Sequence, residues 1–222
     1  MLRHPDNTNL RLHHDDTFEG LPVMVEKGPF VWQYLSRLKH TVDLALEQYS
    51  RLLAFRVDLR LPVGVDLPDH AYTNKVISRF VASFNAKIEH NRDKARERNL
   101  YAHDCKVRYV WAREVGWGGR PHYHLLILLN RDAFYTVGRL RSLVPNMISR
   151  MEEAWASALR LSIDQMKGLV EIPNNAEYRI DRYACPGDVD QLPVLFHRAS
   201  YLCKAATKSF GSNHHGFGCS KS

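Results

Sequence analysis

The chain has 222 residues, of which 45% are hydrophobic and 25% are charged, and this composition is ordinary for a globular protein and excludes wholesale disorder. The length suits one well-buried core and is short for two independent domains. The longest apolar run, residues 125–129, is far too short to cross a bilayer. We therefore expect no membrane span.

The formal net charge is +7, and the basic residues are unevenly distributed. Residues 71–98 hold seven Lys and Arg against three Asp and Glu, and four basic residues but no acidic one follow Asp190. A basic bias focused on particular elements suits a polyanion such as DNA. A solvated basic face explains the same charges about equally well, so charge alone does not decide.

The four cysteines contain no CxxC pair, which argues against a zinc knuckle. Nothing at the N-terminus resembles a secretory signal, so we expect a cytoplasmic protein with reduced thiols at Cys105, Cys185, Cys203 and Cys219.

Residues 1–30 lack hydrophobic periodicity and are interpreted as a leader arm of undetermined fold, preceding a single domain over 31–222. Residues 31–49 repeat apolar side chains with a 3.6-residue period, which predicts an amphipathic helix. Residues 53–61 alternate apolar side chains with Arg56, Asp58 and Arg60, which predicts a half-buried strand.

Residues 71–98 combine apolar and basic faces, which predicts a second helix. Strands are predicted for 106–114 and for the nearly all-apolar 122–129, and the glycine-rich connection between them predicts a hairpin. A helix over 147–161, short strands over 169–172 and 177–180, and a last helix over 189–209 complete the chain. This order predicts an α+β fold, with helices packed on a central antiparallel sheet.

The strongest local signal is the pair His122 and His124, which opens the most apolar strand. Side chains alternate along a strand, so both rings point to one face and can share a cation, while Tyr123 points to the other. Two histidines at this spacing are usually surface or core imidazoles. Here, however, two polar rings on an apolar strand need a compensating partner.

Glu114 is the natural third ligand, because the hairpin brings it back to the histidines. Two imidazoles and one carboxylate leave coordination positions open, which suits Mg²⁺ or Mn²⁺ bridging a phosphate better than a closed structural site. Asp58 is the substitute ligand. As an alternative, Glu114 pairs with Arg113 or Arg120 on the surface.

Tyr201 is the candidate nucleophile. On a helix, His197, Tyr201, Lys204 and Lys208 fall on one continuous face, so the phenol can attack a phosphate while the lysines hold its oxygens or assist proton transfer. A helical tyrosine taken alone is more often a core residue, and the prediction depends on its combination with the histidine pair. The residues expected to contact DNA are Lys75, Arg79, Lys87, Arg120, Arg198 and Lys208.

These motifs resemble those of known enzymes. Glu114, the glycine turn and the Pro-His-Tyr-His of 121–124, followed about eighty residues later by the Tyr-Leu-Cys-Lys of 201–204, resemble motifs two and three of HUH endonucleases. More closely, the stretch from Leu53 to the 216–220 tail resembles the YagK/YfjJ family, also called inovirus gene-two-protein-like, which is found in bacterial prophages and phage satellites.

The resemblance implies a central antiparallel sheet that carries the histidines, with the strand over 55–61 as the first motif. It implies that His122 and His124 bind a divalent metal and that Tyr201 becomes linked to a 5′ phosphate, freeing a 3′ hydroxyl for a polymerase. Lys204 matches the lysine of the tyrosine motif. The expected function is nicking and joining of single-stranded or supercoiled origin DNA, which initiates rolling-circle replication of a phage, satellite or plasmid.

Two features depart from the pattern. The first motif is Phe-Arg-Val-Asp-Leu-Arg rather than a threonine-bearing apolar run, and the last helix offers one plausible nucleophilic tyrosine, which matches single-tyrosine members. A helicase module is absent, so we expect a host helicase and polymerase as partners. The alternatives are a non-catalytic origin or operator DNA-binding protein of the same fold, and a phage-encoded protein that binds a host or helper-phage protein through the leader arm and the Trp32 and Tyr34 face.

Overall fold

The computed structural model describes residues 2–116, 118–139, 142, 144–185, 187, 189–206 and 214–221. Its centre is an antiparallel sheet in the order β10-β6-β8-β7-β11, with β9 pairing with the end of β6. The predicted α+β class is therefore confirmed. The strands are β6 (Arg51–Leu59), β7 (Arg108–Val115), β8 (Pro121–Asn130), β9 (Val170–Glu171), β10 (Glu177–Asp181) and β11 (Phe217–Cys219).

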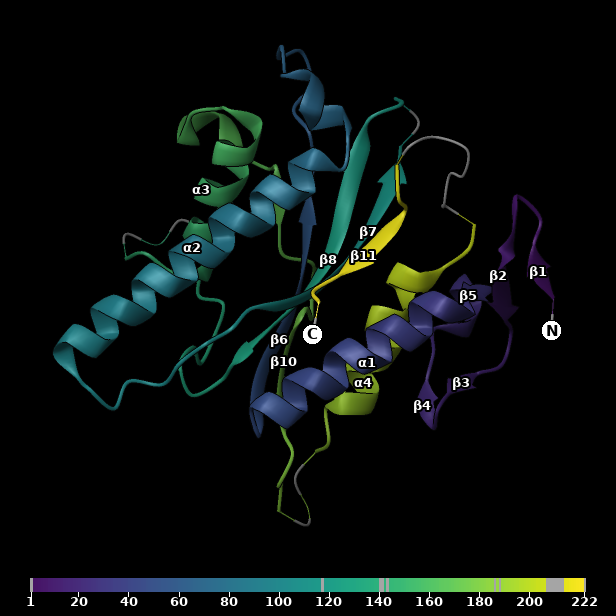
Figure 1. Ribbon diagram of the computed structural model, residues 1–222, viewed down its shortest axis with the longest axis horizontal. Coiled ribbons are helices and arrows are strands. Elements are labelled where there is room, and N and C mark those ends of the chain that lie inside the picture. The colour runs from purple at the N-terminus through teal and green to yellow at the C-terminus, as the bar shows by residue number, and fades with distance from the viewer. Residues whose placement is uncertain are drawn as a thin grey trace.

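Helices cover both faces of this sheet (Figure 1). α1 (Trp32–Gln48) and α4 (Leu192–Ser200) pack on one face, and α2 (Lys75–Arg98) and α3 (Met147–Leu159) pack on the other. Short 3-10 turns are η2 (Asp69–Tyr72), η3 (Ile163–Met166) and η4 (Tyr201–Cys203). None of the helices in the described part of the chain has the length and apolar composition needed to span a bilayer.

The strand predicted over 53–61 is not half-buried, and that expectation is wrong for β6. β6 lies between β10 and β8, and helices cover both of its faces. Phe55 and Val57 face the α2 and α3 side, whereas Arg56 faces the α1 and α4 side and is 5% exposed. The polar residues of the alternating pattern, Arg56 and Asp58, therefore lie inside the protein rather than on a solvent-facing side of the strand.

The leader arm, for which the sequence indicated no fold, forms strands and contributes to the core. Phe18, Val23 and Phe30 are buried among α1 and α4, and Figure 1 shows the small strands beside the start of α1. They are β1 (Arg3–His4), β2 (Asn7–His13), β3 (Thr17–Phe18), β4 (Leu21–Pro22) and β5 (Phe30–Val31), with the 3-10 turn η1 (Val25–Lys27) before β5.

The last helix is shorter than the predicted 189–209. It ends at Ser200 and tightens into η4, and at Lys204 the backbone is no longer helical (ψ 140°). Lys204 instead forms a β-bridge with Phe30, and the Ala205 amide donates to the Pro29 carbonyl at 2.9 Å. The prediction of one continuous helical face through Tyr201, Lys204 and Lys208 is therefore wrong at Lys204. Lys208 lies outside the described residues.

Candidate active site

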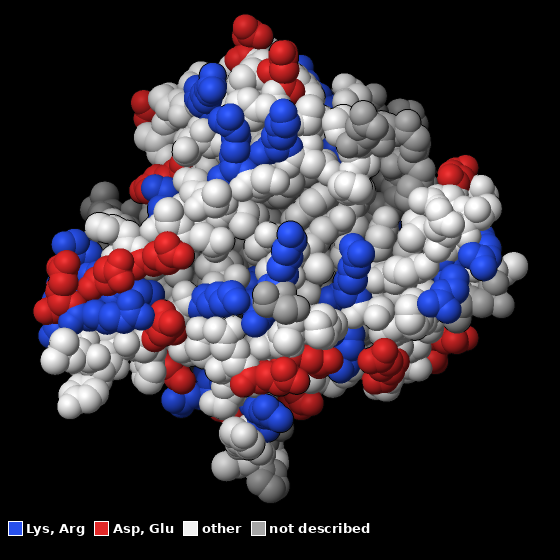
Figure 2. All heavy atoms as spheres, viewed as in Figure 1, with Lys and Arg blue, Asp and Glu red and all other residues white. Residues whose placement is uncertain are grey.

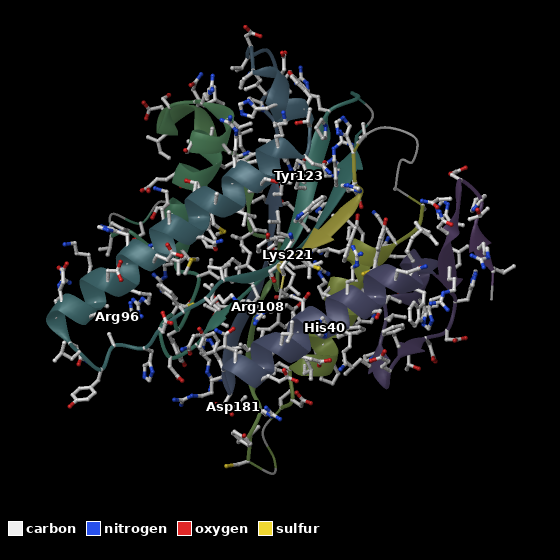
Figure 3. The ribbon with its side chains drawn as sticks, in the orientation of Figure 1. His40, Arg96, Arg108, Tyr123, Asp181 and Lys221 are labelled. Atoms are coloured by element: carbon white, nitrogen blue, oxygen red, sulfur yellow. The ribbon has the colours of Figure 1, made fainter. Side chains whose placement is uncertain are left out.

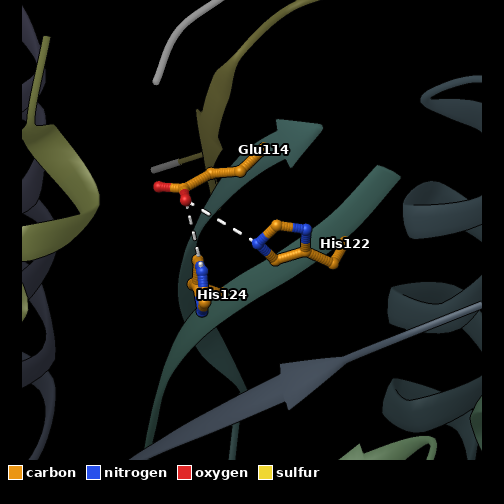
Figure 4. A group of neighbouring side chains, drawn as sticks. All are labelled: Glu114, His122 and His124. Atoms are coloured by element: carbon orange, nitrogen blue, oxygen red, sulfur yellow. Dashed lines mark ion pairs between the residues drawn. The ribbon is translucent and has the colours of Figure 1, made fainter. Parts of the chain in front are cut away.

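The β7–β8 hairpin brings three predicted ligands together. In its register Glu114 lies opposite His122, and the alternation of side chains places His124 on the same face. Glu114 Oε2 is 3.7 Å from His122 Nε2 and 3.6 Å from His124 Nε2 (Figure 4). One ligand atom from each residue lies within 4.8 Å of the other two. The predicted convergence of these side chains is confirmed.

The contacts of this cluster fit a shared cation. His124 Nε2 is buried and has no hydrogen-bond partner among the described residues, since 3.6 Å to Glu114 is too long for a hydrogen bond. Two ligand atoms that are each about 2.1 Å from one cation lie about 3 to 4 Å apart, which matches these separations. The mixed nitrogen and oxygen donors suit Mn²⁺ better than Mg²⁺, which prefers oxygen ligands.

Asp58, the substitute ligand in the sequence, acts on the other side of His124. The two residues are directly opposite in the β6–β8 register, and Asp58 Oδ1 is 2.7 Å from His124 Nδ1. A carboxylate in this place fixes the orientation of a ligating imidazole and leaves its second nitrogen for the metal. The structure thus places Asp58 behind the candidate ligand His124 rather than in the cluster of Glu114, His122 and His124.

The two carboxylates shift the pKa values of the buried pair. Burial alone lowers the pKa of His124, but its interactions with Asp58 and then Glu114 outweigh burial and raise the pKa above its ordinary value. Burial alone raises the pKa of Asp58, whereas the hydrogen bond and charge of His124, together with Arg56, bring the pKa below its ordinary value. The metal-free site therefore favours a charged His124–Asp58 pair.

Lys204 joins Tyr201 to this cluster. Its Nζ donates to the Tyr201 hydroxyl at 2.5 Å and lies 3.1 Å from Glu114 Oε1. The Tyr201 ring also meets the His124 ring edge-on, with centroids 5.4 Å apart. Tyr201 belongs to η4 rather than to the helix, but it lies beside the histidines, as a nucleophile for a metal-bound phosphate must.

The other tyrosines differ in placement from Tyr201. Tyr123 (labelled in Figure 3) lies between the two histidines on β8, so its side chain points to the opposite face of the sheet. Its hydroxyl donates to the Thr73 carbonyl at 3.2 Å. Tyr183 is 75% exposed. Tyr178 is buried on β10 on the same face of the sheet as the cluster, and burial raises its pKa while the charges of Arg198 and Arg56 lower it.

The expected DNA-contact residues fall into three groups. Arg198 lies on α4, one turn before Tyr201, and Arg120 lies in the turn before the histidines, where it donates to the Pro62 carbonyl at 3.1 Å. Lys75 and Arg79 are exposed at the start of α2. Lys87 lies farther along α2 and pairs with Glu153 at 2.6 Å, while Lys208 is outside the described residues.

The turn η2, which directly precedes α2, contacts the hairpin that carries the cluster. Arg113, the residue before Glu114 in the chain, donates from Nη2 to the Tyr72 carbonyl at 3.3 Å. Farther along α2, two basic residues have acidic partners: Lys94 pairs with Glu97, and Arg96 pairs with Asp93 and Asp104. Figure 2 shows acidic and basic side chains side by side over this half of the helix. Within the described residues, Lys75 and Arg79 at the N-terminal end of the helix are exposed and have no ion pair.

Sequence reasoning missed Arg56, which reaches the Tyr201 ring with its Cζ 5.3 Å from the centroid. The signal was present, because a charged residue in the middle of an otherwise apolar strand needs a partner if both faces are buried. It was misread because alternation alone is also the pattern of a strand with one solvent-facing side.

The chain is similar to two proteins of Escherichia coli over most of its length. The chain is 34% identical over 200 residues to the uncharacterized protein YagK of Escherichia coli (strain K12), covering 87% of this chain and 95% of YagK. It is 30% identical over 204 residues to the uncharacterized protein YfjJ of the same strain, covering 88% of this chain and 97% of YfjJ. No solved structure matches. The family model of the YagK/YfjJ C-terminal domain matches residues 13–220, and the chain belongs to this family.

Proposed function

We propose that the chain is a cytoplasmic, metal-dependent DNA nickase and strand transferase of the HUH type, which cleaves one strand through a 5′-phosphotyrosine and so initiates rolling-circle replication. The observation that carries the proposal is the chain of contacts from Tyr201 through Lys204 to Glu114, which joins a nucleophile to the Glu114, His122 and His124 cluster. Neither motif alone carries this meaning, because buried tyrosines and paired histidines are both common in cores.

The proposed step exchanges one phosphodiester bond for another. Tyr201 Oη attacks the phosphorus and forms the tyrosyl phosphoester, the bond to the 3′ oxygen breaks, and its electron pair stays on that oxygen. The phenolic proton passes to solvent and the 3′ oxygen takes one up, so no oxidant or reductant is needed. A bound Mg²⁺ or Mn²⁺ supplies charge that polarises the phosphate. The reverse step, attack by a 3′ hydroxyl, rejoins the strand.

The residues around Tyr201 have separable tasks in this scheme. The Lys204 ammonium offsets negative charge on the attacking oxygen, and a preformed charge of this kind is effective in a partly dry site. Glu114 divides its two oxygens between Lys204 and the histidine side, so that it can bind a cation while holding the lysine. His122 is the most exposed of the three ligands, with 29% of its side chain accessible, and leaves the approach open on the solvent side.

Neither alternative has a specific observation in its favour. A degraded site would not keep the ligand cluster and nucleophile in contact. The aromatic face suggested for a protein partner is used inside the molecule: Tyr34 stacks on Phe217 with centroids 4.4 Å apart, and Trp32 packs against Phe18 and under Arg11.

The test uses single-stranded oligonucleotides tiled over the chain's own gene and its flanks, incubated with the protein and Mn²⁺. We expect a covalent adduct whose modified peptide contains Tyr201, no adduct with EDTA, and none with Tyr201→Phe. Tyr183→Phe, an exposed tyrosine, is the matched control and should keep the adduct. An adduct that persists in Tyr201→Phe, or no adduct on any oligonucleotide, would refute the proposal.

A further inference from the structure

Arg56 lies against the ring of the candidate nucleophile Tyr201, and Arg198 lies one helical turn before Tyr201 in the chain. Arg56 is 5% exposed in the middle of β6, with its Cζ 5.3 Å from the centroid of the Tyr201 ring. Its Nη2 is 3.3 Å from Asp58 Oδ1 and 3.5 Å from His124 Nδ1. Arg198 comes from α4, and its charge acts on both Arg56 and the buried Tyr178.

Each of the two guanidinium groups has one buried nitrogen without a hydrogen-bond partner among the described residues. Arg56 Nε and Arg198 Nε are buried atoms that have no partner within the described ranges. A buried donor on a charged group costs free energy when it is left unsatisfied. Such groups therefore point to a ligand that would accept from them.

The charges around Tyr201 also leave a positive excess. Asp58 is the carboxylate that Arg56 contacts, but it is shared with His124, and Glu114 is engaged by Lys204. Arg56 and Lys204 thus match the charges of Asp58 and Glu114, and Arg198 adds a third cation for which no ion pair is found among the described residues. A bound anion would balance this excess.

We propose that Arg56 and Arg198 form a phosphate-binding subsite beside Tyr201, which holds a phosphodiester of single-stranded DNA next to the one that Tyr201 attacks. Arginine suits this task because its planar fork binds two phosphate oxygens at once. The position of this phosphate in the reaction rests on the proposed function, whereas the binding of the anion does not.

The first experiment uses metal-free protein in EDTA, with inorganic phosphate at low millimolar concentration against chloride of equal ionic strength. Phosphate should raise the thermal midpoint of the wild type. Arg198→Gln should unfold at the same or a higher temperature than wild type without phosphate, because it removes one of two like charges, and should lose the phosphate-dependent rise. Arg56→Lys keeps the positive charge but loses the planar guanidinium, and its affinity for phosphate should be lower by about tenfold or more.

Arg60→Gln is the matched control, since Arg60 follows β6, is exposed and pairs with Glu171 at 2.7 Å. It should keep the phosphate-dependent rise. If Arg198→Gln instead lowers the midpoint without phosphate and keeps the rise, Arg198 is a structural residue and the proposal is overturned. Arg198 is only partly buried, so this variant tests the idea even where Arg56→Lys does not fold.

The second experiment compares oligothymidylate with a methylphosphonate oligomer of the same length, in EDTA. Arg198→Gln should weaken binding of oligothymidylate and leave the neutral oligomer unchanged, and equal effects on both would overturn the assignment to the DNA backbone. A phosphate-dependent rise without any tyrosyl adduct would refute the proposed function and retain the subsite. A tyrosyl adduct without any effect of phosphate on the thermal midpoint would support the proposed function and refute the subsite.

Discussion

The Lys204 ammonium donates a 2.5 Å hydrogen bond to the Tyr201 hydroxyl from a residue that has left the helix. The backbone of Lys204 is held by a β-bridge to Phe30, so the N-terminal segment helps to set the position of the lysine. Its Nζ consequently reaches both the Tyr201 phenol and Glu114. The sequence predicted that Lys204 would lie beside Tyr201 through helical spacing alone.

Replacing Lys204 by Met should separate the chemistry from metal binding. The variant keeps an unbranched side chain but loses the charge beside Tyr201, so the rate of adduct formation should fall by about 100-fold, as on loss of one stabilising donor. Glu114 is freed from the ammonium, so Mn²⁺ affinity should be unchanged or higher. Quenched time courses and Mn²⁺ titration by EPR measure the two effects. Loss of both together would show that Lys204 maintains the site as a whole.

Asp58→Asn should weaken metal binding without removing a ligand. The carboxylate fixes His124 through Nδ1 at 2.7 Å, and loss of such an orienting group costs about 10- to 100-fold in metal affinity. Asp66 is an exposed loop residue, so Asp66→Asn is the control and should bind Mn²⁺ with the affinity of the wild type. Calorimetric titration measures the affinities, and wild-type affinity in Asp58→Asn would contradict the assigned role.

Much of the fold was predictable because it follows from local patterns. The 3.6-residue period of α1, the apolar run of β8 and the glycine turn before it each specify one element and its partner. The leader arm had no such pattern, because its strands are short and Phe18 and Phe30 become buried only through contacts with distant α1 and α4. The end of α4 was misjudged for the same reason, since a long-range β-bridge to Phe30 competes with helix continuation.

The candidate site divides in the same way. Glu114, His122 and His124 lie within one hairpin, so strand alternation was enough to bring them together. Arg56 lies far from Tyr201 in the chain, and its position against the Tyr201 ring depends on how helices cover β6. No periodicity in either segment contains that information.

The stability of the metal-free protein should depend on His124. Its folded pKa lies above the ordinary 6.5, so the protonated ring contributes stability that is fully present below 6.5 and is lost as pH rises through the folded pKa. The folded pKa of Asp58 lies below its ordinary 3.8, so its contribution is present above 3.8 and is lost as pH falls through the folded pKa. The thermal midpoint in EDTA should therefore fall as the pH rises from 6.5 through the folded pKa of His124.

Mn²⁺ should reverse this trend, because binding requires the neutral imidazole and becomes tighter over the same pH range. Thermal scans of wild type and His124→Gln across that range provide the check. If His124→Gln shows the same decline in EDTA as wild type, another group causes it.

We expect single-stranded DNA to pass the N-terminal end of α2. Lys75 and Arg79 are exposed there, and no ion pair of theirs is found in the part of the chain that the structure describes. Each phosphate contact with a single strand contributes about 0.7 to the slope of log affinity against log salt, so the double variant Lys75→Gln/Arg79→Gln should bind more weakly with a slope smaller by about 1.4. Lys94→Gln/Arg96→Gln removes the same charge from the acid-paired end of the helix and should change the slope little. Fluorescence anisotropy with oligothymidylate at several salt concentrations measures both, and equal losses in the two variants would indicate general attraction to a basic protein rather than a path past the start of α2.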